Sequence, residues 1–269
     1  MASQSHLRPL VLGGPPPRFG CRAPAVLTGE RTFNLNVVAM NPVVFDAGPV
    51  TSPATSAGAR REYHSPLRRS QSEQTRAAVL DAATRLFSQN GWAGTGVRDI
   101  AAEAGVSVET VYAAVGTKAQ VLEQALDVAI VGDDEPVDLT ARPEFQAMSA
   151  GDLRARIAAA ADLSATVNAR TVGLLRALRE AAAREPALAA RLEEARSGHR
   201  ATVRAGATLV AGRTVDGTEA DGLWAVLSPE MFELLTGSAG WSTQQYRRWL
   251  AGAMESLLGT TTSRCGEAD

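Results

Sequence analysis

The chain has 269 residues, of which 45% are hydrophobic and 5% aromatic, so it can bury a sizeable core and hold more than one domain. Its formal net charge of -2 and its two cysteines exclude a uniformly basic protein and a disulfide-rich scaffold. Alanine and leucine dominate the second half, which favours helices over sheets. No apolar run approaches the ~18 residues that predict a membrane span.

Residues 1–69 are predicted to be a disordered, basic extension, because Pro, Gly, Ser and Thr recur there without a helical period. Residues 1–70 carry eight arginines against three acids, a net charge of +5, so the rest of the chain carries -7. Two interpretations stay open: a native extension, or a start codon assigned too early, with Met40 as one internal candidate. The segment shows no secretion signal, so a cytoplasmic location is expected.

Residues 70–131 are predicted to form four helices. The first begins at Ser70, where Glu73 would complete a capping box, and ends at Gly91. The last begins at Thr117 and carries an apolar face of Val121, Leu122, Ala125, Leu126 and Ala129.

Two short helices lie between these, at about 97–104 and 108–115, joined by the string EAGVS. Gly105 suits a tight turn because glycine tolerates positive φ, and Ser107 is a good N-cap for the following helix. Two short helices joined in this way indicate a helix-turn-helix, whose second helix points its N-terminal end into the major groove of DNA.

Residues 138–259 are predicted to form a second, all-helical domain, followed by a disordered tail at 260–269. Apolar stripes and caps place its helices at about 153–167, 172–182, 186–203, 218–227, 229–235 and 243–258.

The string from Arg76 to Leu122 closely resembles the TetR family of regulators. The matching elements include the Gly91–Trp92 turn, the Ala104–Ser107 turn, Val111–Tyr112 and the Gly116–Lys118 entry to the next helix. The resemblance implies an all-α fold with an N-terminal three-helix helix-turn-helix domain and a C-terminal bundle that binds a ligand and dimerises. It implies a homodimer on a palindromic operator in double-stranded DNA, released by a small-molecule effector. Repression is the family's usual outcome, and activation stays an alternative.

The resemblance also assigns residues. The recognition helix would begin with Ser107, Val108 and Glu109 near base edges. The hydroxyl groups of Thr110 and Tyr112 and the Lys118 ammonium group would contact phosphates. The predicted DNA-binding residues are Arg98, Ser107, Val108, Glu109, Thr110, Tyr112, Ala113, Ala114 and Lys118. The resemblance places a dimer interface on the stretches of about 219–236 and 243–258, and the predicted interface residues are Leu223, Trp224, Phe232, Tyr246, Trp249, Leu250 and Leu257.

Three departures from the family pattern support a rival interpretation, a helical ligand-binding or interaction module with degenerate DNA recognition. Gly96 replaces the usual capping threonine, Val115 replaces an aromatic residue, and the pair Ala113–Ala114 offers little hydrogen-bonding readout. The arginine pairs at 60–61 and 68–69 allow two interpretations, an arm in the minor groove or a solvated linker.

The sequence contains no catalytic constellation, so an enzyme is not expected. The three histidines, at positions 6, 64 and 199, are isolated, and no cofactor or metal is expected. The pattern does not identify the effector or the residues that bind it.

Overall fold

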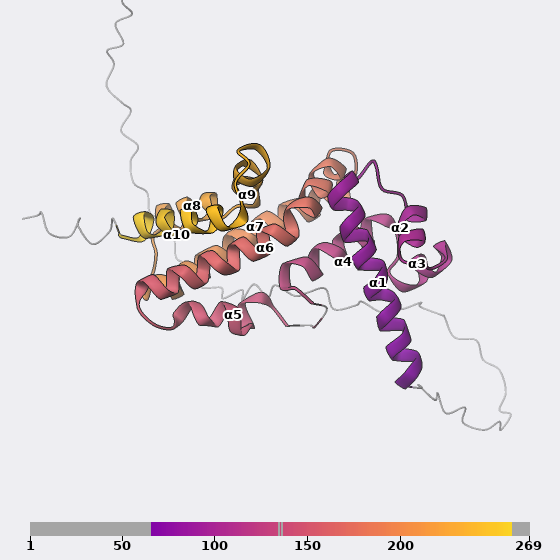
Figure 1. Cartoon of the computed structure of the whole chain (residues 1–269), viewed down its shortest axis with the longest axis horizontal. Helices are drawn as coiled ribbons and strands as arrows, with labels where there is room; N and C mark the ends of the chain where they lie inside the picture. The colour runs from indigo at the N-terminus through magenta and orange to yellow at the C-terminus, as the bar shows by residue number, and fades with distance from the viewer. Residues whose placement is uncertain (1–65, 134, 136, 260–269) are drawn as a thin grey trace, which may run out of the picture. The chain divides into compact units, whose positions relative to one another are not determined.

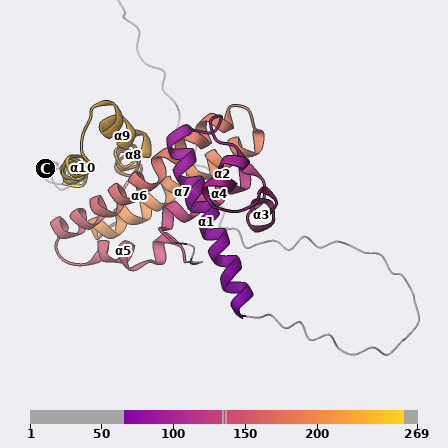
Figure 2. The same cartoon turned by 45° about the vertical axis from the view of Figure 1, so that its right-hand side comes forward.

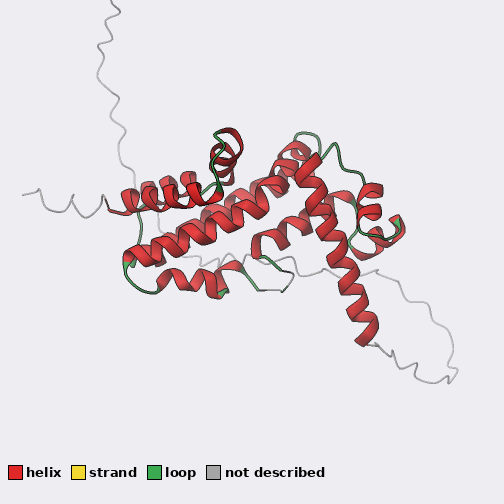
Figure 3. Ribbon diagram, viewed as in Figure 1, coloured by secondary structure: helices red, strands yellow, loops and turns green. Residues whose placement is uncertain are grey.

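The computed structural model describes residues 66–133, 135 and 137–259, and every regular element among them is helical (Figures 1 and 3). The predicted all-α fold is therefore confirmed. The elements are α1 (Pro66–Asn90), α2 (Val97–Glu103), α3 (Val108–Ala114), α4 (Lys118–Val131), η1 (Leu139–Ala141), α5 (Pro143–Gln146), η2 (Ala147–Ser149), α6 (Leu153–Ala182), α7 (Pro186–Ala211), α8 (Gly217–Val226), α9 (Pro229–Glu233), the π-helical turn η3 (Leu234–Ser238) and α10 (Thr243–Gly259).

The first helix begins earlier than predicted. It starts at Pro66 rather than Ser70, so Ser70 and Glu73 lie exposed inside it and do not form its cap. Proline suits the first helical position because it needs no N–H partner there and its φ is already helical. The end is as predicted: α1 stops at Asn90, and Gly91 follows with φ +70°.

The helix α4 matches its prediction closely. Thr117 accepts the Gln120 N–H, and the Gln120 side chain accepts the Thr117 N–H in return, which completes the capping box. The five residues predicted to be buried are all buried. The chain then leaves the helix at Gly132, whose φ is +102°.

One long helix, α6, replaces the two helices predicted at 153–167 and 172–182. The polar residues between these two stripes are accommodated inside the helix. The Asn168 amide donates to the Leu227 carbonyl at 3.0 Å, and the Thr171 hydroxyl donates to the Val167 carbonyl at 2.9 Å. Since both buried side chains are hydrogen-bonded, the interruption of the apolar stripe does not end the helix.

The short turns η1, α5 and η2 lie in a stretch where no helix was predicted. Phe145 and Met148 are buried there and pack against Gly206 of α7. A Cβ at Gly206 would lie 3.3 Å from the Met148 terminal methyl group, so the absence of a side chain lets this segment approach α7 closely.

Two apolar cores result. The first joins α1–α4 to the C-terminal part of α6 and the start of α7, through Leu174, Leu178 and Leu188. The second fills the bundle of α6–α10 and includes Ile157, Leu223, Phe232, Tyr246 and Leu250. The helix α6 contributes to both cores, and the views in Figures 1 and 2 show it running beside α7.

Among the described helices, none is both long and apolar enough to cross a membrane.

Candidate nucleic-acid interface

The turn between α2 and α3 has the geometry that its sequence predicts. Gly105 has φ +68°, and the Val106 N–H donates to the Ala101 carbonyl at 2.9 Å. Val106 packs against the first core, and Ser107 caps α3 by accepting the Thr110 N–H at 3.2 Å. These contacts fix the direction in which α3 leaves the turn.

The helix α3 has an inner and an outer face. Val111 is fully buried and anchors the helix, whereas Glu109, Tyr112 and Ala113 are exposed, Tyr112 to 52%. Val108, Thr110 and Ala114 lie half-buried between the two faces. The predicted recognition residues therefore lie on α3 or at its N-cap. Tyr112 is the large side chain that α3 exposes.

The hydroxyl groups of Ser107 and Thr110 lie 3.1 Å apart and hydrogen-bond to each other. The Glu109 N–H first, and the Ser107 hydroxyl second, lower the pKa of the Glu109 carboxyl, so this group is ionised at neutral pH. The N-terminal end of α3 thus presents a carboxylate, which accepts hydrogen bonds from amino groups and repels phosphates.

The side chain of Lys118 contacts the segment that connects α1 and α2. Its Nζ donates to the Trp92 carbonyl at 2.6 Å and lies 4.0 Å from the centre of the Trp92 ring. Burial lowers the pKa of Lys118, and the carboxylates of Glu185, Glu180 and Asp99 oppose that effect. The predicted phosphate-binding lysine is therefore half-buried in this structure and already has protein partners.

Three arginines of α1 and α2 have different surroundings. Arg85 pairs with Asp81 and Glu103, and Arg76 donates to the Gln124 side chain at 2.9 and 3.2 Å. Arg98, on α2, is exposed. Of these three arginines, Arg98 is the one that was predicted to bind DNA.

Both unusual residues of the motif keep their local roles. Gly96 is the N-cap of α2, where the Asp99 carboxylate accepts its N–H at 2.8 Å. Val115 ends α3 and packs against the first core, as predicted for this smaller apolar residue. Neither departure disturbs the fold of the helix-turn-helix.

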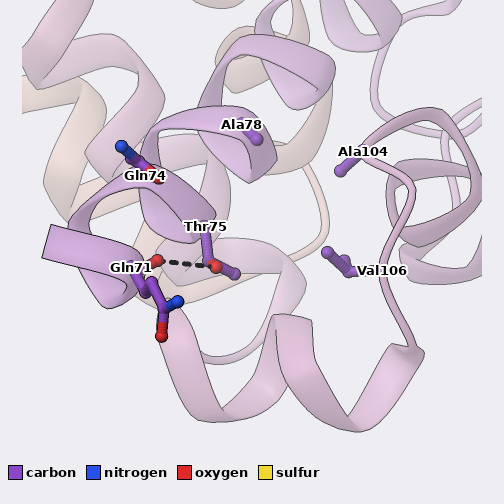
Figure 4. A pocket seen from close by; sticks show the side chains of 6 residues that line it. All are labelled: Gln71, Gln74, Thr75, Ala78, Ala104 and Val106. Atoms are coloured by element: carbon purple, nitrogen blue, oxygen red, sulfur yellow. Dashed lines mark hydrogen bonds between the residues drawn. The ribbon is translucent and has the colours of Figure 1, made fainter. Parts of the chain in front are cut away.

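A shallow hollow of about 460 Å³, lined by Gln71, Gln74, Thr75, Ala78, Ala104 and Val106, lies between α1 and the turn before α3 (Figure 4). Sequence reasoning missed it because its walls come from two segments about thirty residues apart. It also missed Glu180 of α6, whose carboxylate accepts the Trp92 N–H across 88 positions of the chain. Neither feature has a local sequence signal.

Four of the seven residues predicted for a dimer interface belong to the interior of the protomer, and that part of the prediction is wrong. Leu223, Phe232, Tyr246 and Leu250 are at most 5% exposed because α8, α9 and α10 pack on α6 and α7 with these side chains inward. The other three, Trp224, Trp249 and Leu257, are half-buried. The apolar stripe of α10 identified a core face.

Within the described ranges, no three or more His, Cys, Asp or Glu side chains gather closely enough to hold a metal ion.

Residues 79–125 match the family model of bacterial regulatory proteins of the tetR family. Two curated relatives are an HTH-type transcriptional repressor of Mycobacterium tuberculosis and an HTH-type transcriptional regulator of Mycobacterium bovis. Each is 37% identical over 76 residues, which are 26% of this chain and 40% of the relative. The chain therefore spans about two fifths of the length of the curated relatives it matches.

Solved structures extend the likeness to the body of the fold. A TetR-family regulator from Mesorhizobium loti has a TM-score of 0.53, with 22% identity over 71% of this chain and 98% of that one. A regulator of the same family from Rhodococcus sp. has a TM-score of 0.52, with 22% identity over 69% of this chain and 98% of that one. At this identity the likeness concerns the fold alone. The helix-turn-helix geometry and the family match at residues 79–125 support a regulator of the TetR family.

Proposed function

We propose that the chain is a transcriptional regulator that binds double-stranded DNA with α3 in the major groove. The observation that carries this proposal is the two-faced α3, anchored by buried Val111 and exposing Glu109, Tyr112 and Ala113. A short helix held from behind, with its outer face free of core contacts, is the form in which helix-turn-helix proteins present side chains to base edges.

The chemistry of that face indicates how DNA is read. The Tyr112 hydroxyl and the exposed Arg98 suit phosphate contacts, which fix the register of the helix on the duplex. Glu109 is ionised and can accept from a cytosine amino group, while the Ala113 methyl group can meet a thymine methyl group. Because few hydrogen-bonding side chains face the bases, we expect modest direct readout, aided by the shape of the DNA.

The finer parts of the proposal concern assembly and control. We propose a homodimer on a palindromic operator in the cytoplasm, with the outward surfaces of α8 and α10 facing the second copy. The C-terminal bundle would bind a small molecule that favours a spacing of the two α3 helices unsuited to the operator. Since coupling is reciprocal, DNA would weaken effector binding by the same factor. One relative is called a repressor, which supports repression as the outcome.

The alternative is a helical ligand-binding or interaction module without DNA recognition. One observation favours it: Glu109 places a negative charge at the tip of α3, and Arg85 is neutralised by two carboxylates. Binding of DNA that is sequence-selective and weakens with salt would exclude this alternative.

The test is a selection of genomic DNA fragments on the purified full chain and on the Tyr112→Ala variant. Tyr112 is half exposed, so its truncation spares the core, and Leu234→Ala, an equally exposed side chain on η3, is the matched control. An enriched palindrome that is lost with Tyr112→Ala and kept with Leu234→Ala supports the proposal. Failure of the native chain to enrich any fragment across a range of salt concentrations would overturn it.

A further inference from the structure

The C-terminal end of α6 is hydrogen-bonded to the turn between α1 and α2. Both oxygens of the Glu180 carboxylate are used: one accepts the Trp92 N–H at 2.8 Å and the other accepts the Ala93 N–H at 3.1 Å. Hydrogen bonds to an ionised acceptor are roughly twice as strong as neutral ones. One side chain of α6 therefore accepts hydrogen bonds from two consecutive backbone N–H groups of the DNA-binding segment.

The turn has no room for a side chain next to this carboxylate. Gly91 has φ +70°, and a Cβ built on it would lie 2.7 Å from the Glu180 Oε2 atom. Glycine is needed there both for the backbone conformation and for the close approach of the carboxylate. The turn is thus shaped around Glu180.

The other side of the Trp92 backbone holds Lys118. Its Nζ donates to the Trp92 carbonyl and lies over the Trp92 ring, and Phe87 stacks on the same ring at a centroid distance of 5.8 Å. The Trp92 N–H therefore donates to Glu180, and the Trp92 carbonyl accepts from Lys118. A displacement of the Trp92 backbone would move both the acceptor and the ring that hold the lysine.

The same part of α6 also contacts α9. Arg179 pairs with Glu230 at 3.1 Å and with Glu233 at 2.5 Å. One turn before, Arg176 donates to the Ser88 carbonyl of α1 at 2.6 Å and lies 4.0 Å from Glu233. The helix α9 is thus connected through Arg176 to the end of α1, and its partner Arg179 is adjacent to Glu180, which binds the turn that follows α1.

We infer that Glu180 is a positioning residue, by which α6 sets the place of the Lys118 ammonium group through the backbone of Trp92. Lys118 stands at the N-terminus of α4, beside α3, and is the chain's only lysine. Its position relative to the recognition helix therefore depends on a residue of the ligand-binding bundle. The consequence for DNA rests on the proposed function, but the position of Lys118 can be measured without DNA.

The single lysine makes that measurement direct. Reductive methylation with ¹³C-formaldehyde labels Lys118 and the N-terminal amine of the full chain, and a Lys118→Arg variant assigns the two signals. Dimethyl-lysine keeps its charge and one N–H for the Trp92 carbonyl. Methyl groups over an indole ring are shifted upfield by the ring current, so the native signal is expected upfield of free dimethyl-lysine.

Two variants disturb Glu180 in different ways. Glu180→Gln removes the charge and leaves one acceptor, whereas Glu180→Asp keeps the charge but is too short to reach both N–H groups. The matched control is Glu185→Gln, because Glu185 also acts electrostatically on Lys118. Far-UV circular dichroism and melting temperature show which variants remain folded, and a single folded Glu180 variant is enough for the test.

We expect both Glu180 variants to move the Lys118 signal at least halfway toward the free value, and Glu185→Gln to leave its position unchanged. An unchanged signal in a folded Glu180 variant would overturn the inference, as would an equal change in Glu185→Gln or a native signal without an upfield shift. In DNA titrations we expect Glu180→Gln to lose about fivefold in affinity relative to Glu185→Gln. If the native chain binds no DNA, the proposed function fails while the methyl signal still decides the role of Glu180.

Discussion

Tyr112 and Val111 are neighbours in α3 with opposite environments, one 52% exposed and the other fully buried. At the scale of single residues this division separates recognition from stability. We expect a change at Tyr112 to act on the proposed DNA contact and a change at Val111 to act on the fold. The two effects can therefore be measured separately.

The first prediction concerns the Tyr112 hydroxyl. Tyr112→Phe should weaken DNA binding by roughly tenfold, because a hydrogen bond to a charged phosphate is worth about 1.5–3 kcal/mol. The melting temperature should stay unchanged, since the ring remains and the site is exposed. Fluorescence anisotropy with the selected operator measures the affinity. An affinity equal to that of the native chain would remove Tyr112 from the set of phosphate contacts.

The second prediction compares two glycines with nearly the same backbone conformation. Gly91 and Gly105 have φ +70° and +68°, but a Cβ meets Glu180 at the first and nothing within 4 Å at the second. Gly105→Ala should cost about 1–2 kcal/mol of unfolding free energy through backbone strain alone. Gly91→Ala should cost ~2 kcal/mol more, because it also displaces a carboxylate that accepts two hydrogen bonds. Urea titrations give both values, and equal losses would mean that Glu180 adjusts without cost.

Much of the recognition helix was predictable from single residues. Ser107, Gly105 and Thr117 act through neighbours within a few positions, so their roles are visible in the local sequence. The partners of Lys118 were not predictable. Trp92 lies 26 positions away, and Glu180 and Glu185 act on Lys118 from the body of the fold. Long-range partners of this kind are set by tertiary packing.

At the scale of elements, α6 shows why a polar interruption did not predict a helix end. Asn168 lies at the middle of the helix and hydrogen-bonds the end of α8 and the Tyr246 hydroxyl, at 3.0 and 3.3 Å. The Tyr246 hydroxyl in turn donates to the Val226 carbonyl at 3.4 Å. A polar residue that breaks an apolar stripe can thus be a buried link between helices, and the sequence alone does not distinguish it from a loop residue.

The third prediction uses the pH dependence of this link. Burial raises the pKa of Tyr246 to about 12, although the Asn168 hydrogen bond acts in the opposite direction. The unfolded chain loses this proton near pH 10, before the native state does, so the free energy of unfolding falls between about pH 10 and pH 12. The loss from this group approaches roughly 2.7 kcal/mol at the upper end of that range.

Tyr246→Phe removes the titrating group. Its cost near pH 7 should be about 1 kcal/mol, for a lost hydrogen-bond partner. Between pH 9 and pH 11.5 the native chain should lose ~2 kcal/mol more stability than the variant. Urea unfolding at both pH values gives the difference, and parallel losses in the two proteins would show that Tyr246 titrates normally.

At the scale of the whole molecule, the two apolar cores do not follow the predicted boundary between residues 70–131 and 138–259. The first core extends from α1–α4 into α6 and α7, so the DNA-binding segment and the start of α7 share one interior. The boundary predicted at the polar loop near residue 133 separates segments of the sequence, but it does not separate the two apolar cores. This sharing gives the bundle a physical connection to α3, as control by an effector requires.

The last prediction locates the surface for a second copy. The inner stripe of α10 is core, so in the proposed dimer we expect the second copy to contact the outer side of α10, where Gly252 is exposed and a Cβ would have nothing within 4 Å. Gly252→Arg should therefore leave the protomer folded and shift it from dimer to monomer by at least tenfold in the dimer dissociation constant. A large charged side chain cannot be accommodated where two helices pack closely.

Gly252→Ala is the matched control, because it makes the same change in helix propensity without the bulk or the charge. Sedimentation velocity over a range of concentrations measures the dissociation constants, and circular dichroism checks the fold. A monomer formed by the arginine variant alone, together with weaker binding to a palindrome, would place the outer face of α10 at the dimer axis. A dimer of native strength in both variants would exclude that face, and the half-buried Trp224 on α8 would then be the next position to examine.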